Sequence, residues 1–187
     1  MIHKLEEGVF EVNTSESYNK EIYLFGNNII IPYINLEIFE NKTPFNKVNQ
    51  YDRLDFSYLI FKNVEEISWS YGNSLEKLNF NHTSTGNQEC IIDYVLGANM
   101  LNKHDGFEFK IKYEEQYLYY SEFSVSAKTG ALNFWMPINT PNFMKNISEE
   151  KVLEFFNQEN IPTEILKFLK INDISRGKVK ILPGSQL

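Results

Sequence analysis

Apolar and polar positions alternate along much of the first 140 residues, which is typical of β-strands with one buried face. The clearest example is the segment INLEI at 34–38, in which every second residue is a branched aliphatic one. Before it, two apolar runs meet at Gly-Asn-Asn, 26–28, and these residues accept the positive φ of a tight turn. We therefore expect a β-hairpin over 21–39, in which Pro32, which has no N–H group, marks a sheet edge or a bulge.

Three further strands follow in the central part of the chain. The apolar patterns place them at 55–61, 65–71 and 89–97. The segment 40–55 has no periodicity and predicts a surface loop. Lys62 and Asn63 stand between the first two of these strands, and they predict a turn or a bulge there.

A three-stranded antiparallel meander is the most distinct pattern of the β-rich region, over 106–138. Apolar and charged residues alternate over 107–113, so we expect one face of this strand in the core and the other in solvent. Two short polar segments, Glu-Glu-Gln at 114–116 and Ala-Lys-Thr-Gly at 127–130, separate the three apolar runs. We expect a turn at each of them.

The periodicity becomes helical after Pro137. Ser148 is a suitable N-cap for a first helix, and Pro162 ends that pattern and begins a second, shorter helix. The sequence thus predicts an α+β fold, predominantly antiparallel β as a meander, sandwich or partly open barrel, with a C-terminal helical hairpin packed on the sheet. We expect residues 1–140 to form the antiparallel β domain, and residues 141–187 to add the helical hairpin and tail to the same compact unit.

The composition predicts a folded core and a reducing environment. With 187 residues, 42% hydrophobic and 15% aromatic, the chain suits one domain with its own core. Its single cysteine cannot form an internal disulfide, which fits a reducing compartment. The sequence begins without an apolar signal-peptide segment, and no run approaches the about 18 apolar residues that span a bilayer. We therefore expect a cytoplasmic protein that does not enter a membrane.

Acidic residues dominate the charge and are concentrated near the start of the chain. The net charge is −7, and residues 1–41 contain two lysines against seven glutamates. A second acidic group marks the outer face of the first predicted helix and consists of Glu149, Glu150, Glu154 and Glu159. Such charge serves solubility, and it can also steer a basic partner. A phosphate backbone would be repelled, so the sequence disfavours nucleic-acid binding.

Cys90 and His82 are the candidates for catalysis, because a thiolate nucleophile needs a nearby base. Glu89 precedes the cysteine and disfavours its thiolate form, and Cys90 opens an apolar strand in which a thiol packs as a small hydrophobe. The close ligand pairs of metal sites, C-x-x-C or H-x-x-x-H, do not occur around Cys90, His104 and Asp105. We therefore predict no catalytic residue, no metal site and no cofactor.

The leading hypothesis is a non-catalytic, acidic protein-binding module, such as an immunity or inhibitor protein that blocks a basic toxin or enzyme. An outward patch of aromatic and acidic residues on the meander would have the composition enriched at interfaces. The residues expected to contact the partner are Glu11, Glu16, Glu21, Glu37, Tyr120, Glu122 and Trp135. Two alternatives remain open: a small-ligand-binding β domain with an aromatic-lined cavity, and a hydrolase or transferase that uses Cys90 or His82.

Overall fold

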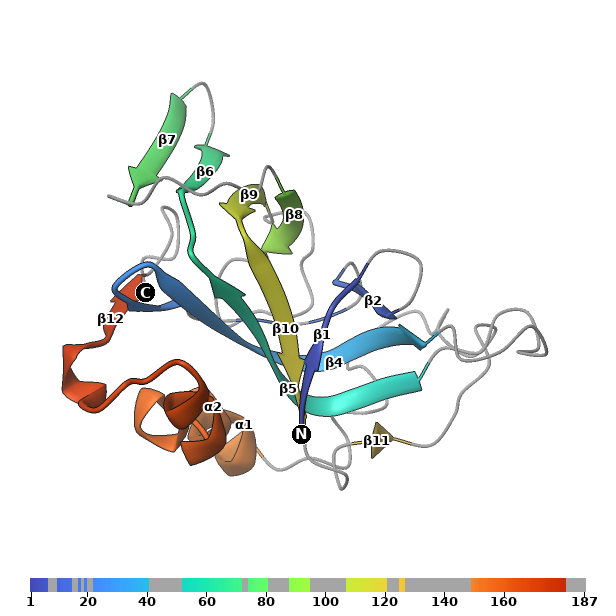
Figure 1. Ribbon diagram of the computed structural model, residues 1–187. Helices are drawn as coiled ribbons and strands as arrows, with labels where there is room; N and C mark the ends of the chain where they lie inside the picture. Colours follow the sequence, from blue (N-terminus) through green and yellow to red (C-terminus); the bar gives the residue numbers. More distant parts are fainter. Residues whose placement is uncertain are drawn as a thin grey trace.

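The residues that the structure describes form two antiparallel β-sheets and two short α-helices, and the helices lie near the C-terminus (Figure 1). The computed structural model describes residues 1–6, 10–14, 17, 19, 22–40, 52–71, 74–80, 88–94, 107–120, 125–126 and 149–180. Within these residues, the prediction of a predominantly antiparallel β fold is confirmed.

The larger sheet is built around two long neighbouring strands, β4 and β5. Its order is β1-β10-β5-β4-β3-β12, and β2 and β11 pair with β4 and β5, respectively. Its strands are β1 (Ile2–Lys4), β2 (Phe10–Asn13), β3 (Ile22–Phe25), β4 (Asn28–Glu40), β5 (Asp52–Lys62), β10 (Glu115–Tyr119), β11 (Val125–Ser126) and β12 (Lys178–Lys180). The smaller sheet has the order β7-β6-β9-β8 and consists of β6 (Glu66–Tyr71), β7 (Ser74–Asn79), β8 (Gln88–Tyr94) and β9 (Phe107–Tyr113). The helical segments are α1 (Glu149–Phe155), the 3-10 turn η5 (Gln158–Asn160), α2 (Thr163–Phe168) and the 3-10 turn η6 (Ile174–Arg176).

The β3–β4 hairpin forms where the sequence predicts it, with Gly26 at a φ of 63° in the turn. β4 as a whole is an interior strand, because it pairs with β5 on one side and with β3 and β2 on the other. β3 pairs with β4 up to Ile30, and β2 pairs with it from Glu37. Pro32 therefore lies between the part of β4 that pairs with β3 and the part that pairs with β2. Its missing N–H group removes no hydrogen bond from either pairing.

β5 begins inside the segment 40–55 that the sequence predicts to be a loop. Asp52 pairs with Ile38 and Arg53 with Glu37, so these polar residues are held in the sheet by β4. Cross-strand pairing has overridden the weak local strand preference of this segment. In Figure 1, β5 bends sharply along its length and then leads into the smaller sheet.

The predicted meander over 106–138 is wrong in its pairing. β9 and β10 are separated only by Glu114, yet β9 lies between β6 and β8, whereas β10 lies between β1 and β5. Gln116, expected in a turn, belongs to β10. The segment Glu-Glu-Gln lacks the glycine or asparagine that favours a tight hairpin turn, and the chain continues in extended form from one sheet into the other. The third predicted strand, 131–138, falls outside the described residues.

A bulge joins the two sheets. The pairing of β5 with β10 continues as the pairing of β6 with β9. Between these two pairings, the three residues 63–65 lie opposite only two residues, 113–114. Asn63 is accommodated there with a φ of 53°, and its Nδ2 donates a hydrogen bond to Glu114 Oε2 at 2.7 Å. The turn or bulge predicted at Lys62 and Asn63 is thus confirmed.

Two apolar clusters form the core of the part of the chain that the structure describes. The first draws on both sheets and includes Ile29, Ile31, Leu59, Phe61, Ile67, Ile111 and Tyr113. The second lies on the other face of the larger sheet and includes Tyr23, Ile30, Tyr58 and Ile60, together with Ile161, Ile165 and Leu169 from the helical segment. Because neighbouring residues of β4 enter different clusters, the larger sheet is covered on both faces there. Within this helical segment, Ile165 lies in α2 and Leu169 follows the helix directly.

Candidate functional site

An acidic surface with one exposed apolar side chain lies on α1 and on the turn η5 that follows it. The side chains of Glu150, Glu154 and Glu159 are exposed, and Leu153 is 56% exposed. Leu153 and Glu154 follow Glu150 by three and four residues, so they share one side of α1 with it. The helix also carries Lys151, which is exposed. We call Glu150, Leu153, Glu154 and Glu159 the acidic helical face.

Hydrogen bonds fold η5 back against the end of α1. The N–H of Asn157 donates to the carbonyl of Glu154 at 3.1 Å, and Asn160 Nδ2 donates to the same carbonyl at 2.6 Å. Asn157 also caps η5, because its Oδ1 accepts the N–H of Glu159 at 3.0 Å. These bonds hold η5, which carries the exposed Glu159, against the end of α1.

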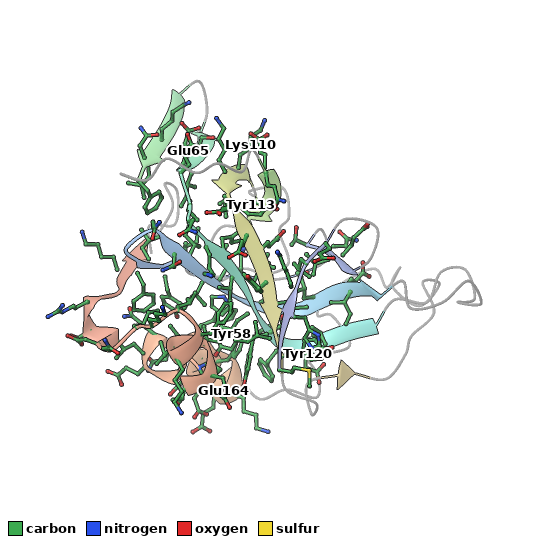
Figure 2. The ribbon with its side chains drawn as sticks, in the orientation of Figure 1. Tyr58, Glu65, Lys110, Tyr113, Tyr120 and Glu164 are labelled. Carbon is green, nitrogen blue, oxygen red and sulfur yellow. The ribbon has the colours of Figure 1, made fainter. Side chains whose placement is uncertain are left out.

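The inner side of α1 packs on aromatic residues of the larger sheet. The ring centroid of Phe155 lies 4.7 Å from that of Phe56 and 5.0 Å from that of Tyr58. Tyr23 Oη donates a hydrogen bond to the carbonyl of Phe156, which is buried. Figure 2 shows Tyr58 between the sheet and the helices. Because these contacts turn the phenylalanines towards the sheet, Leu153 is left on the solvent side.

Burial raises the pKa values of the tyrosines beneath the helices. It raises the pKa of Tyr58 far above its ordinary value, and the nearby Tyr119 raises that pKa further. Burial also raises the pKa of Tyr119, and Glu164 at the start of α2 adds to this shift. Tyr58 Oη donates to the carbonyl of Asn160 at 3.4 Å. The raised pKa values mean that both phenols remain protonated at a higher pH than ordinary tyrosines, so they serve as packing groups and hydrogen-bond donors under the helical layer.

A cluster of charged and aromatic residues around Lys62 links α2 to the larger sheet. Lys62 Nζ lies 3.0 Å from Glu115 Oε2, and it sits over the rings of Tyr117 and Phe168 at 5.6 and 5.2 Å from their centroids. The hydrogen bond from Lys62 lowers the pKa of Glu115. Burial, and then the hydrogen bond to Glu115, raise the pKa of Tyr117 to about 12. No local sequence pattern indicates this cluster, because its members come from β5, β10 and α2.

The structure describes three of the seven residues predicted to contact a partner. Glu11 is exposed on β2, beside the strand that carries Glu37. Glu37 is only 8% exposed and accepts a hydrogen bond from Asn13 Nδ2 at 2.7 Å. Its carboxylate is therefore bonded to another residue of the same chain. Tyr120 is half-buried and stacks on His3, with the ring centroids 5.1 Å apart.

These three residues do not form one patch. Tyr120 follows β10, and β5 lies between β10 and the pair of strands β2 and β4 that carries the two glutamates. The other four predicted contact residues fall outside the described part of the chain; they are Glu16, Glu21, Glu122 and Trp135. Sequence reasoning identified the acidic outer face of the first helix, but it did not identify Leu153 as an exposed residue within it.

The candidates for catalysis and metal binding are mostly outside the described residues. Cys90 lies in β8 opposite Ile111 of β9, whereas His82, His104 and Asp105 are not described. Among the side chains that are described, no three His, Cys, Asp or Glu residues are grouped as a metal site requires. In the same part of the chain, no helix has both the length and the apolar character needed to cross a membrane.

Comparison of the chain with protein-family models, curated proteins and solved structures found no significant match.

Proposed function

We propose that this protein is a non-catalytic, acidic protein-binding module of the inhibitor or immunity type, which blocks a basic toxin or enzyme. The observation that supports the proposal is the acidic helical face, where Leu153 is exposed among three exposed glutamates. Binding surfaces commonly combine an apolar group that becomes buried with a polar rim that stays near solvent. In this proposal, α1 and α2 are the two helices of the C-terminal hairpin expected from the sequence.

The two kinds of side chain would have different effects on binding. The carboxylates of Glu150, Glu154 and Glu159 would attract a basic surface and mainly increase the association rate, which falls as salt rises. Leu153 would lose its solvent contact in the complex, and full burial of a leucine side chain contributes about 1.5–3 kcal/mol. Phe155 packs on the sheet beneath this surface and holds α1 in place. The helix should therefore lose little conformational freedom on binding.

The N-terminal acidic segment remains part of the proposal. Glu11 is exposed on β2, and it belongs to the predicted contact set together with Glu16 and Glu21. Glu37 is left out of the proposed surface because it is buried. Reversing the charge of each acidic segment separately will show which of them faces the partner.

The experiment measures the affinity of the full chain for the basic protein encoded beside its gene, by titration calorimetry at low and at high salt. We expect Leu153→Asp, and separately the double variant Glu150→Lys/Glu154→Lys, to weaken binding by at least about tenfold. High salt should weaken the wild type more than the charge-reversed variant. The matched control is Glu89→Lys, an exposed charge reversal on β8 of the smaller sheet, which should change the affinity little.

Two results would contradict the proposal in different ways. Absence of any complex with that protein would remove the inhibitor function. A complex whose affinity is unchanged in both the Leu153→Asp and the charge-reversed variant would keep the binding function but reject the acidic helical face as its site. Circular dichroism of each variant checks that the fold is retained.

A further inference from the structure

Two buried polar side chains, Asn19 before β3 and Ser57 of β5, leave a polar atom without a partner among the described residues. In the described part of the chain, the polar residues that are more than nine-tenths buried are Ser17, Asn19, Glu37, Ser57 and Gln116. Ser17, Glu37 and Gln116 each have a protein partner for their side chain. By contrast, Asn19 Oδ1 and Ser57 Oγ have no hydrogen-bond partner among the described residues.

Tyr33 connects these two side chains. Ser57 of β5 pairs directly with Tyr33 of β4, so their side chains lie on the same face of the sheet as close neighbours. Asn19 Nδ2 donates a hydrogen bond to Tyr33 Oη at 3.1 Å. Ser57 and Tyr33 are fully buried and Asn19 is 7% exposed. The surroundings are apolar, because Tyr33 belongs to the first core cluster with Ile31 and Leu59.

We infer that Asn19 Oδ1 and Ser57 Oγ bind an internal water molecule beside Tyr33. A buried polar atom that lost its hydrogen bonds to water on folding and gained none destabilises the folded state. Buried water molecules in proteins typically make about three hydrogen bonds to such atoms. This water donates one hydrogen bond to Asn19 Oδ1, which can only accept, and forms another with Ser57 Oγ, which can donate or accept. The inference is independent of the proposed function.

A crystal structure that resolves ordered water, combined with one substitution, tests this site. We expect density within hydrogen-bond distance of both Asn19 Oδ1 and Ser57 Oγ. Ser57→Ala removes one of the partners of the water and should lower the melting temperature by about 2–4 °C, whereas Ser68→Ala, at a half-buried serine of β6, should change it by less than about 2 °C.

The sign of the shift separates the alternatives. Without the water, Ser57 Oγ is an unpaired buried atom, so Ser57→Ala would remove a penalty and raise the melting temperature. A raised melting temperature, or a crystal structure with no density between the two atoms, would overturn the inference. The crystal structure of the wild type decides the question even if the variant does not fold.

Discussion

The end of α2 contains a backbone strain that a single substitution should relieve. Lys170 follows the helix with a φ of 56°, a conformation that glycine adopts most easily. The N–H of Ile171 donates to the carbonyl of Leu166 at 2.8 Å, and the N–H of Lys170 donates to that of Lys167 at 3.1 Å. These bonds form a Schellman motif, and Leu166 and Ile171 both pack against the second core cluster, as that motif favours. The Lys170 side chain is exposed.

Lys170→Gly should therefore stabilise the protein. The left-handed conformation costs an L-residue about 1–2 kcal/mol, and glycine loses about 0.4–1 kcal/mol through the greater entropy of its unfolded state. The net gain is about 0.5–1 kcal/mol, which raises the melting temperature by about 1–4 °C for a chain of this length. Asn63 also has a positive φ, but Asn63→Gly should destabilise the protein, because the side chain donates to Glu114 and such a bond to a charged group contributes about 1.5–3 kcal/mol.

Urea unfolding followed by circular dichroism measures both variants against the wild type. Lys170→Ala is the matched control, because it removes the charge and keeps the strained backbone. The reasoning is refuted if Lys170→Gly is no more stable than Lys170→Ala, since that result would mean the left-handed conformation has no cost at this position. It is also refuted if Asn63→Gly is more stable than the wild type, because the bulge would then depend on its backbone alone.

Three further outcomes follow from the packing of the helical layer. Gly177→Ala should destabilise the protein by about 1–3 kcal/mol, because the added methyl group overlaps the ring of Phe25; unchanged urea unfolding would contradict this. Tyr23→Phe should cost about 1 kcal/mol, because the carbonyl of Phe156 loses its buried donor; equal thermal stability of the two proteins would argue against that bond. The pKa of Tyr117 is raised from 10.0 to about 12, so the folded state favours the neutral phenol; stability should fall as pH rises from about 10 to about 12, and Tyr117→Phe should flatten this slope in unfolding curves measured across that range.

Local patterns predicted the parts of the fold that depend on neighbouring residues. The hairpin at Gly26 and the bulge at Asn63 are each specified by a few consecutive residues, and both predictions are confirmed. The acidic outer face of α1 was also readable, because charged residues recur there at helical spacing. Leu153 was missed, because a leucine in a helix is ordinarily expected on the buried side.

Long-range pairing could not be read from the sequence. β9 and β10 each carry an alternating pattern, but alternation does not say which strand lies beside them, and both find their partners elsewhere. Glu37 illustrates the same limit. It occupies the polar position of an alternating strand, yet it is buried because Asn13, 24 residues away, contributes its amide. The cluster around Lys62 depends on three elements that come together only in the folded chain.

The bulge at Asn63 has a consequence for how the protein unfolds. β5 pairs with β10 and β6 pairs with β9, so these four strands form one continuous two-stranded ribbon that passes through both sheets. The first core cluster contains residues of both sheets. Neither sheet can open along this ribbon without exposing apolar side chains of the other. The two sheets should therefore behave as a single cooperative unit, with amide protons on either side of the bulge exchanging at similar free energies.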